Sequence, residues 1–274
     1  MKSIVLHLIF AITSIVFTGI TYSQYSSPES ATYDSVSSRY FVSNTSSRII
    51  SQRDLQGNVD FVNVGALYME SRFMAEEFTS AMAQRCAVTI FQTLQKLLQI
   101  AGSSFLNDLA IDASGMIYVS DFTARRIYKV NSANQDYWTY VASTTNTPNG
   151  VYVDAPRNRL LVCCWGSSAP IRAVSFADSS IATLVITPYS NLDGITLDRN
   201  DNVYVSTWGI QSVVKYDINF SQAPVIVTGG LSNPADIFVN KSKDTLEIPN
   251  AGNNTVTFAN IGTLSGILTS LSET

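Results

Sequence analysis

A segment of roughly 40 residues recurs along this chain, and such a repeat restricts the fold more than any other feature of the sequence. The copies share a short alternating strand, a polar turn and a second apolar strand, with a third strand after them. They lie at Pro28–Val42, Leu106–Asp121, Pro148–Val162 and Leu192–Ser206, with a weaker copy at Asn233–Glu247. Each copy therefore predicts a small antiparallel sheet.

The turn between the first two strands opens at an equivalent residue in every copy. These residues are Asp34, Asp112, Asp154, Asp198 and Asn240, separated by 78, 42, 44 and 42 residues. The first interval is twice the length of a repeat, so one copy is hidden within it. Six units predict an all-β, six-bladed β-propeller that forms one domain over residues 24–274. The alternative all-β fold is a β-sandwich, but sandwiches do not repeat their sequence in this way.

Residues 66–100 occupy the place of the second blade, and their sequence differs from the repeat. Phe91, Leu94, Leu97 and Leu98 fall at helical spacing. This spacing predicts that a helical segment replaces the second blade or forms a lid.

The genetic code offers another interpretation of the same residues. If the third base of each codon is joined to the first two bases of the next, Met69-Glu70, Met74-Ala75 and Met82-Ala83 must each encode glycine. In that frame the stretch is compatible with Gly-Ile-Glu-Val-Tyr-Gly-Gly-Arg-Ile-Tyr-Val-Cys-Asp-Gly, which has the strand–turn–strand pattern of the missing unit. A shifted reading frame within a propeller gene therefore explains the disrupted second blade.

The first 23 residues are typical of a secretory signal peptide. Lys2 precedes the apolar run Ile4–Phe17, and small and polar residues follow up to Ser23. The run is short for a transmembrane anchor and has no basic flank after it. We expect residues 1–23 to be removed, which leaves a secreted or extracytoplasmic protein without a membrane anchor.

The expected mature chain contains no histidine, because the only one is His7. This excludes Ser-His-Asp and Cys-His nucleophilic catalysis and zinc sites that use histidine. Without Lys2 the chain has 16 Lys+Arg against 21 Asp+Glu, so its formal charge is −5 and nucleic acid is not an expected partner. Neighbouring residues on a strand point to opposite faces, so the adjacent Cys163 and Cys164 suit buried packing better than a disulfide.

Polar side chains recur five residues before the turn-opening position. In a propeller these positions begin the innermost strands and surround the mouth of the central channel. The column reads Glu29, Tyr68 in the disrupted unit, Asn107, Asn149, Asp193 and Ala235. Carboxylate and amide oxygens are hard ligands, so the column predicts a divalent metal site that favours Ca²⁺. The alternative is that the Asn-Gly and Asp-Gly pairs are ordinary turn residues.

Residues that end the second strands are further candidates for a binding face. They are Asp121, Trp165, Trp208 and Asn250. Packing between blades is the alternative role for the two tryptophans.

The repeats in Pro28–Val64 and Phe105–Ile261 resemble the six-bladed propellers of the NHL type and of the senescence-marker-protein/gluconolactonase family. The second resemblance implies a divalent-metal-dependent lactonase or esterase. It assigns Glu29, Asn149 and Asp193 as metal ligands and Asn107 as a channel-facing, substrate-binding residue. Asp193 is then the catalytic carboxylate that handles the proton of water while the metal polarises the substrate carbonyl.

One departure from the family pattern affects the predicted substrate. The family's sugar-lactone enzymes place an Arg two residues before the channel-facing Asn, where this chain has Phe105, which argues against a sugar-acid lactone. The NHL resemblance implies the alternative function, a non-catalytic binding or scaffold propeller. The expected partner is a small-molecule or extracellular ligand.

The coding nucleotide sequence tests the reading-frame hypothesis directly. We expect the shifted frame over codons 66–100 to encode a strand–turn–strand repeat with glycine at the three forced positions. The matched control is the shifted frame over Leu192–Ser206, which should encode no such repeat. A shifted frame interrupted by stop codons, or without the repeat pattern, contradicts the hypothesis and favours the helical segment.

Overall fold

The computed structural model describes residues 25–34, 38–47, 49–54, 59–62, 100–131, 133–134 and 136–262. These residues form strands and connecting turns, with one short 3₁₀ helix at Ala155–Arg157. No helix in the described ranges is long and apolar enough to span a membrane. The expected signal peptide and residues 66–100, with their alternative interpretations, lie outside these ranges.

The described strands form five antiparallel sheets that follow one another along the chain. The first sheet contains β1 (Pro28–Asp34), β2 (Arg39–Asn44), β3 (Ile49–Arg53) and β4 (Val59–Val62). The second contains β5 (Leu106–Ile111), β6 (Met116–Asp121), β7 (Arg126–Asn131) and β8 (Tyr137–Val141). The third contains β9 (Thr147–Asp154), β10 (Arg159–Trp165), β11 (Pro170–Ser175) and β12 (Ile181–Ile186). The fourth contains β13 (Leu192–Leu197), β14 (Val203–Thr207), β15 (Ser212–Tyr216) and β16 (Val225–Thr228), and the fifth β17 (Phe238–Asn240), β18 (Thr245–Asn250) and β19 (Thr255–Asn260).

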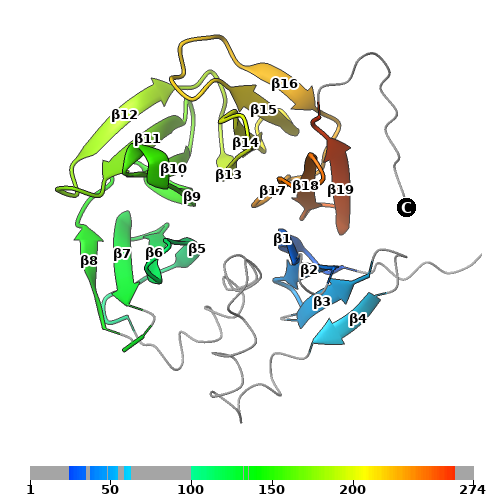
Figure 1. Ribbon diagram of the computed structural model, residues 1–274, viewed down its shortest axis with the longest axis horizontal. Helices are drawn as coiled ribbons and strands as arrows, with labels where there is room; N and C mark the ends of the chain where they lie inside the picture. Colours follow the sequence, from blue (N-terminus) through cyan, green and yellow to red (C-terminus); the bar gives the residue numbers. More distant parts are fainter. Residues whose placement is uncertain are drawn as a thin grey trace, which may run out of the picture.

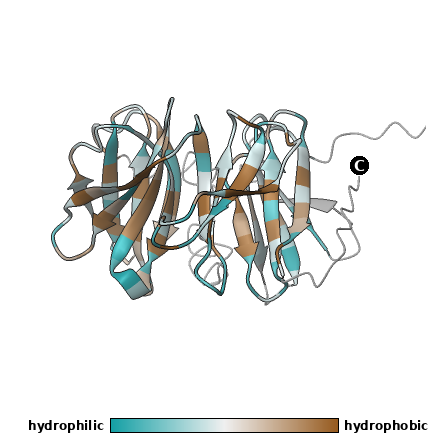
Figure 2. Ribbon diagram, turned by 90° about the horizontal axis from the view of Figure 1, so that it is seen from above, coloured by the Kyte–Doolittle hydropathy of each residue, from teal (hydrophilic) through white to brown (hydrophobic). Residues whose placement is uncertain are grey.

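The sheets are arranged as the blades of a β-propeller around a common centre (Figure 1). The first strand of each sheet lies nearest the centre, and the last strand lies on the outside. Seen from above, the strands cross the thickness of the molecule, and hydrophilic residues gather at many of the turns (Figure 2). The propeller prediction is confirmed, and five of the six expected blades fall within the described residues.

Apolar side chains between neighbouring blades form the core. The third and fourth sheets share a cluster that includes Leu161, Ile171, Ile195 and Val214, all fully buried. Equivalent clusters join the second sheet to the third and the fourth to the fifth. Each blade therefore depends on its neighbours for burial of its faces.

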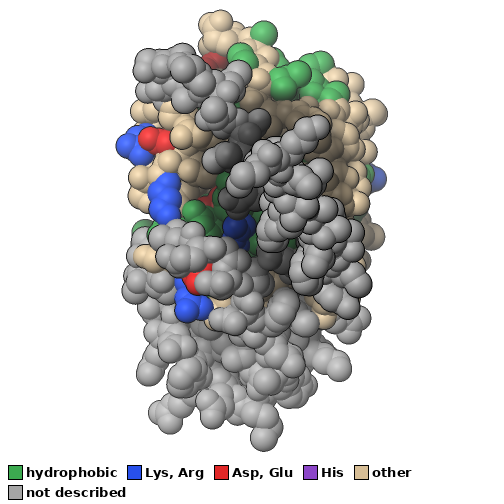
Figure 3. Space-filling model, turned by 90° about the vertical axis from the view of Figure 1, so that its right-hand side faces the viewer, with side chains coloured by type: hydrophobic (Ala, Val, Ile, Leu, Met, Phe, Trp, Pro, Cys, Tyr) green, Lys and Arg blue, Asp and Glu red, His purple; other side chains and the backbone are tan. Residues whose placement is uncertain are grey.

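The first and last described sheets meet without a shared strand. The Asp236 amide donates a hydrogen bond of 2.9 Å to the Glu29 carbonyl, and the Ser27 amide donates one of 2.6 Å to Oδ1 of Asn254. Tyr25, Ala31 and Val42 pack with Val256 beside these bonds. On the side of the molecule formed by this region, basic and acidic side chains of the described residues are interspersed (Figure 3).

Two of the turn-opening residues, Asp112 and Asp198, cap their turns, as the repeat predicts. Oδ1 of Asp198 accepts hydrogen bonds from the amides of Asn200 and Asn202, at 2.8 and 2.9 Å, and Oδ2 accepts one from the Tyr204 hydroxyl. Asp112 makes the same bonds with its own turn and with Tyr118. A short acidic side chain at this position satisfies backbone donors that the turn leaves unpaired.

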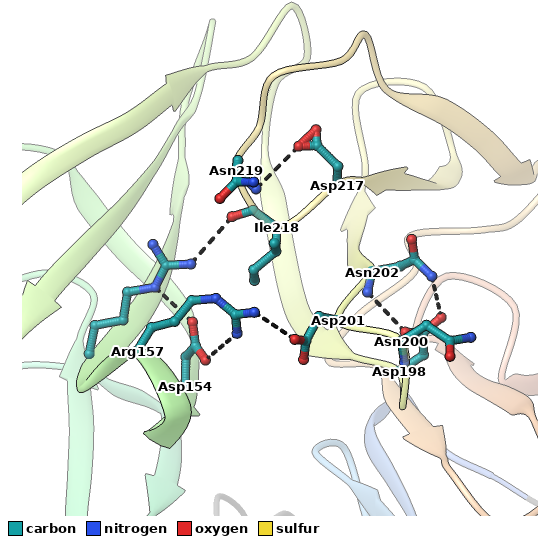
Figure 4. Close-up of polar contacts among 10 residues, drawn as sticks. Asp154, Arg157, Asp198, Asn200, Asp201, Asn202, Asp217, Ile218 and Asn219 are labelled. Atoms are coloured by element: carbon teal, nitrogen blue, oxygen red, sulfur yellow. Dashed lines mark hydrogen bonds and ion pairs between the residues drawn. The ribbon is translucent and has the colours of Figure 1, made fainter.

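Asp154 holds the third and fourth blades together at the same end. Its two oxygens lie 3.0 Å from Arg157 Nη1 and 2.7 Å from Arg159 Nε, and Arg157 Nη2 reaches Asp201 of the next blade at 2.5 Å (Figure 4). The Asp154 carboxylate is almost fully buried, so its two arginine partners compensate its charge.

The inner strands approach one another so closely that only glycine fits at two positions. A Cβ at Gly150 would lie 2.3 Å from the Asp193 carbonyl oxygen, and one at Gly194 would lie 2.4 Å from the Ile237 amide nitrogen. Both neighbours are backbone atoms and cannot rotate away. The two glycines therefore set the distance between successive blades at the channel.

We expect Gly194→Ala to destabilise the protein by about 1–3 kcal/mol, because the blades must separate to admit the methyl group. Urea unfolding followed by circular dichroism measures the loss. Gly229→Ala is the matched control, since its Cβ would meet only the rotatable Ser212 hydroxyl, at 3.0 Å, and should cost roughly 0.5 kcal/mol or less. Equal stability of the two variants would contradict the proposed close approach.

Candidate functional site

A β-bulge interrupts each of the first four inner strands at the predicted site positions. Two residues of the inner strand lie opposite one residue of the second strand at 29–30, 107–108, 149–150 and 193–194. A bulge redirects side chains and leaves ladder groups unpaired, and bulges are common beside binding sites. The predicted column thus coincides with a repeated irregularity of the backbone.

A hydroxyl or thiol opposite each bulge satisfies the unpaired amides. Amides of the bulges donate to the hydroxyls of Ser43, Ser120 and Ser206, at 3.0, 2.9 and 2.7 Å. The Ser206 hydroxyl then donates to the Ala235 carbonyl of the next blade, at 2.8 Å. The bonds fix each bulge and connect it to the neighbouring blade.

Cys163 takes the place of serine in the third blade. Its thiol donates to the Asp193 carbonyl of the next blade at 2.9 Å, and the Gly150 amide interacts with its sulfur. Burial, followed by the neighbouring Cys164, raises the pKa of Cys163 well above its usual value, so the thiol stays protonated. Both cysteines are free and fully buried, which confirms the packing role predicted for them.

The two predicted amide residues form a chain across three blades. Asn107 Nδ2 donates to Asn149 Oδ1, and Asn149 Nδ2 donates to the Leu192 carbonyl at 3.1 Å. Asn149 is buried, and Asn107 is only partly buried. This series of hydrogen bonds ends at Leu192, one residue before Asp193, so the structure brings Asn107, Asn149 and the Asp193 segment together.

The two predicted carboxylates lie close enough at the same mouth for the charge of Glu29 to act on Asp193. Burial, followed by the Asp236 carboxylate, raises the pKa of Glu29 to about 7. Burial also raises the pKa of Asp193 well above its usual value, and the charges of Glu29, Asp236 and Asp108 raise it further. The Trp208 indole acts in the opposite direction by favouring the charged form of Asp193.

Asp108 and Asp236 were not predicted, and both follow the predicted column by one residue. Asp108 ties blades together, because Oδ2 accepts the Val151 amide of the next blade at 2.7 Å. Asp236 replaces the carboxylate that the fifth blade lacks at Ala235, and it lies beside Ser30 through a parallel bridge. The sequence signal for both aspartates is their common position, one residue after the predicted column.

Aromatic side chains form an arc on the same end of the propeller, which we call the aromatic arc. It contains Phe105, Phe122, Trp165 and Trp208. Successive ring centroids lie 5.8, 5.9 and 5.1 Å apart, in tilted or edge-to-face arrangements. Trp165 and Trp208 therefore pack against each other, and both remain partly exposed.

The other predicted residues of this face have structural roles. Asp121 is buried and accepts the amides of Ser104, Phe105 and Ala124 at 2.8, 3.1 and 2.9 Å. Asn250 accepts the Ser232 amide and donates to the hydroxyls of Thr255 and Thr257. These side chains shape the loops at the mouth through bonds to the protein itself.

The donor chemistry of Glu29, Asn149 and Asp193 fits a hard divalent cation, because two carboxylates and an amide supply only oxygen ligands. Asn149 Oδ1 accepts a hydrogen bond from Asn107, so ligation through that oxygen requires Asn107 to turn away. Across the described ranges, no three His, Cys, Asp or Glu side chains form a group that could hold a metal ion. The predicted set combines two carboxylates with the amide of Asn149, and asparagine is not one of those four residue types.

Comparison with solved structures supports the propeller fold. A chain from the crystal structure of a nidogen–laminin complex is similar over 85% of this chain and 76% of that one, with 13% identity and a TM-score of 0.55. The extracellular domain of a putative one-component system from B. thetaiotaomicron matches 84% of this chain and 27% of its own, with 9% identity and a TM-score of 0.46. A putative gluconolactonase matches 83% and 72%, with 11% identity and a TM-score of 0.46.

No protein-family model matches the chain, and a search of curated proteins found no significant match. The nidogen–laminin similarity establishes a shared fold. Propellers have many functions, so the function has to be argued from the site.

The raised pKa of Glu29 gives the stability a pH dependence of known sign. The folded protein binds this proton more tightly than the unfolded chain, so the contribution is complete below the usual pKa of 4.5 and is lost as pH rises toward 7. In EDTA, we expect the melting temperature to fall by several degrees between about pH 5 and about pH 8. Glu29→Gln should flatten this profile, whereas Asp136→Asn, in an exposed turn, should leave it unchanged. A wild-type slope in Glu29→Gln would assign the effect to other groups.

Proposed function

We propose that the channel mouth binds a divalent cation, with Ca²⁺ favoured, and that the protein is a secreted hydrolase of lactones or esters. The observation that carries the proposal is the convergence of Glu29 and Asp193 with the Asn107–Asn149 pair at the bulges. The charge of Glu29 raises the proton affinity of Asp193, so a bound cation would relieve this repulsion. The cation is held by Glu29, Asn149 and Asp193.

The chain's own groups suit hydrolysis without histidine. A bound divalent cation supplies Lewis-acid polarisation of the carbonyl. Asp193 accepts a proton from the attacking water and returns it to the leaving alcohol oxygen, as the acyl carbon–oxygen bond breaks. Asn107 holds the substrate through its amide, which becomes free for this role when it turns away from Asn149 Oδ1 and that oxygen binds the cation.

The second candidate function is ligand binding without catalysis. The aromatic arc favours it, because a partly exposed row of rings is suited to a binding face. The similarity to a chain of the nidogen–laminin complex adds a precedent for this fold within an extracellular protein assembly. In this function the channel mouth binds an extracellular ligand and leaves it unchanged.

Thermal melts in EDTA and in millimolar CaCl₂ test the cation site. A ligand at about 100 times its dissociation constant adds about 2.7 kcal/mol to the folded state, which raises the melting temperature of a chain of this size by roughly 5 °C or more. Asp193→Asn should abolish most of this rise. In EDTA the same variant should melt higher than the wild type, because it removes a charge from the carboxylate cluster. Asp136→Asn is the exposed control and should respond to calcium as the wild type does.

The two expected changes in the melting temperature of Asp193→Asn, a rise in EDTA and a loss of the calcium response, distinguish a role in cation binding from a role in folding. A residue with only a structural role would lower the melting temperature in EDTA when it is replaced. A full calcium response in Asp193→Asn, or none in the wild type, contradicts the cation site. Lactone and ester hydrolysis that needs CaCl₂ and is lost in Asp193→Asn supports the hydrolase, whereas a calcium response without hydrolysis favours the binding propeller.

A further inference from the structure

The mouth of the channel has two chemically different halves. The ends of the second strands carry aromatic residues in the second, third and fourth blades, with Trp165 as the last residue of β10 and Phe122 and Trp208 directly after β6 and β14. The equivalent residues of the first and fifth blades are Thr45 and Ala251. The carboxylates of Glu29 and Asp236 belong to the first and fifth blades, and Asp193 lies in the fourth blade beside Trp208.

The aromatic arc continues directly into the candidate site. Trp208 follows the strand residue paired with Leu192, and its indole lies close enough to the Asp193 carboxylate to lower the pKa of that group. The Trp208 ring nitrogen is buried and makes no hydrogen bond of normal geometry within the described structure. A ligand held at Asp193 would therefore contact the arc.

The backbone around the arc holds the rings in place before any ligand arrives. Asp121 accepts the Phe105 amide at 3.1 Å, and the Phe122 amide donates to the Phe105 carbonyl at 2.8 Å. The Trp208 amide donates to the Asn191 carbonyl at 3.0 Å, and the Gln211 side chain donates to the Trp208 carbonyl at 2.8 Å. Rings fixed in this way lose little freedom on binding.

Phe105 is the outermost ring of the arc, and 47% of its surface is exposed. Two other exposed apolar side chains, Ile186 and Ile210, belong to the same end of the propeller. A polyhydroxylated ligand needs many hydrogen-bond partners, and the rings of the two phenylalanines supply none. An apolar ligand would instead remove these surfaces from water.

We propose that the aromatic arc binds the hydrocarbon part of the substrate, which makes the substrate an alkyl or aryl lactone or ester. This assignment rests on the proposed function, since the ester group must lie at Asp193 while the hydrocarbon part extends over Trp208 and Trp165 toward Phe105. The anionic or polyhydroxylated sugar lactones are excluded by the same surface.

The three tryptophans of the chain allow a direct binding test. Trp138 lies on β8, away from the arc, so Trp138→Phe leaves Trp165 and Trp208 as the only emitters. In this background, γ-nonanolactone is titrated in EDTA, where catalysis is absent, and again in CaCl₂. We expect saturable quenching by γ-nonanolactone and none by gluconolactone.

Variants then locate the binding surface. Phe105→Ser should weaken γ-nonanolactone binding about fivefold to twentyfold, because it removes an exposed ring from the contact. Val225→Ser is the matched control, since Val225 is 58% exposed on the outer strand β16 and should leave binding unchanged. Phe105 contacts solvent on one side, so its replacement leaves the blade core intact.

The outcomes separate this inference from the proposed hydrolase. Tight binding of gluconolactone, or unchanged γ-nonanolactone binding in Phe105→Ser, overturns the apolar assignment even if calcium-dependent hydrolysis is found. Quenching that is weakened by Phe105→Ser without any hydrolysis supports the aromatic arc as the surface that binds hydrocarbon. The protein would then be the non-catalytic binding propeller.

Discussion

The close approach of neighbouring inner strands determines the structure around the channel. At Gly150 and Gly194 the backbone of one blade lies where a side chain would otherwise be, against backbone atoms of the next blade. This spacing leaves no room for a regular ladder with side chains on both faces. The bulges at the same positions are consistent with this constraint, since each turns its two residues away from the regular alternation.

A bulge leaves one backbone amide without a ladder partner. In each of the first four blades, a side chain of the second strand accepts a hydrogen bond from this amide. Serine does so in three blades, and Cys163 does so in the third. The oxygen or sulfur accepts from the bulge, and in the third and fourth blades it donates to a carbonyl of the following blade. The same local bonds thus shape the site and hold the ring together, because a buried amide without a partner would be costly.

Sequence predicted the features that depend on local chemistry. The turn-opening role of Asp112 and Asp198 could be predicted because each caps a turn only a few residues long, and such bonds depend on residues close in the sequence. The first residue of each bulge was found for the same reason, since it keeps a fixed distance from the turn. Asp236 lies outside the predicted column because it follows Ala235 by one residue, and its place beside Glu29 depends on a contact between the first and fifth blades.

Features that depend on contacts between blades could not be predicted in this way. The pairing of Asn107 with Asn149 spans 42 residues, and the influence of Glu29 on Asp193 joins the first and fourth described blades. From the sequence, Trp165 and Trp208 suit either packing between blades or a binding face, and the structure is consistent with both roles. Each ring packs against a neighbouring ring and remains partly exposed, so one surface stabilises the blades while another faces the mouth.

The division of the mouth follows from these repeated positions. Each of the first four blades offers the same two places, the first residue of the bulge and the end of the second strand, and the residue at each place differs from blade to blade. Glu29 and Asp236 lie at the junction of the first and fifth blades, Asp193 lies in the bulge of the fourth, and the rings use the other positions in the second to fourth blades. Because Trp208 and Asp193 belong to the same blade, the two halves meet there, and a ligand with one polar and one apolar end is the chemistry that matches both.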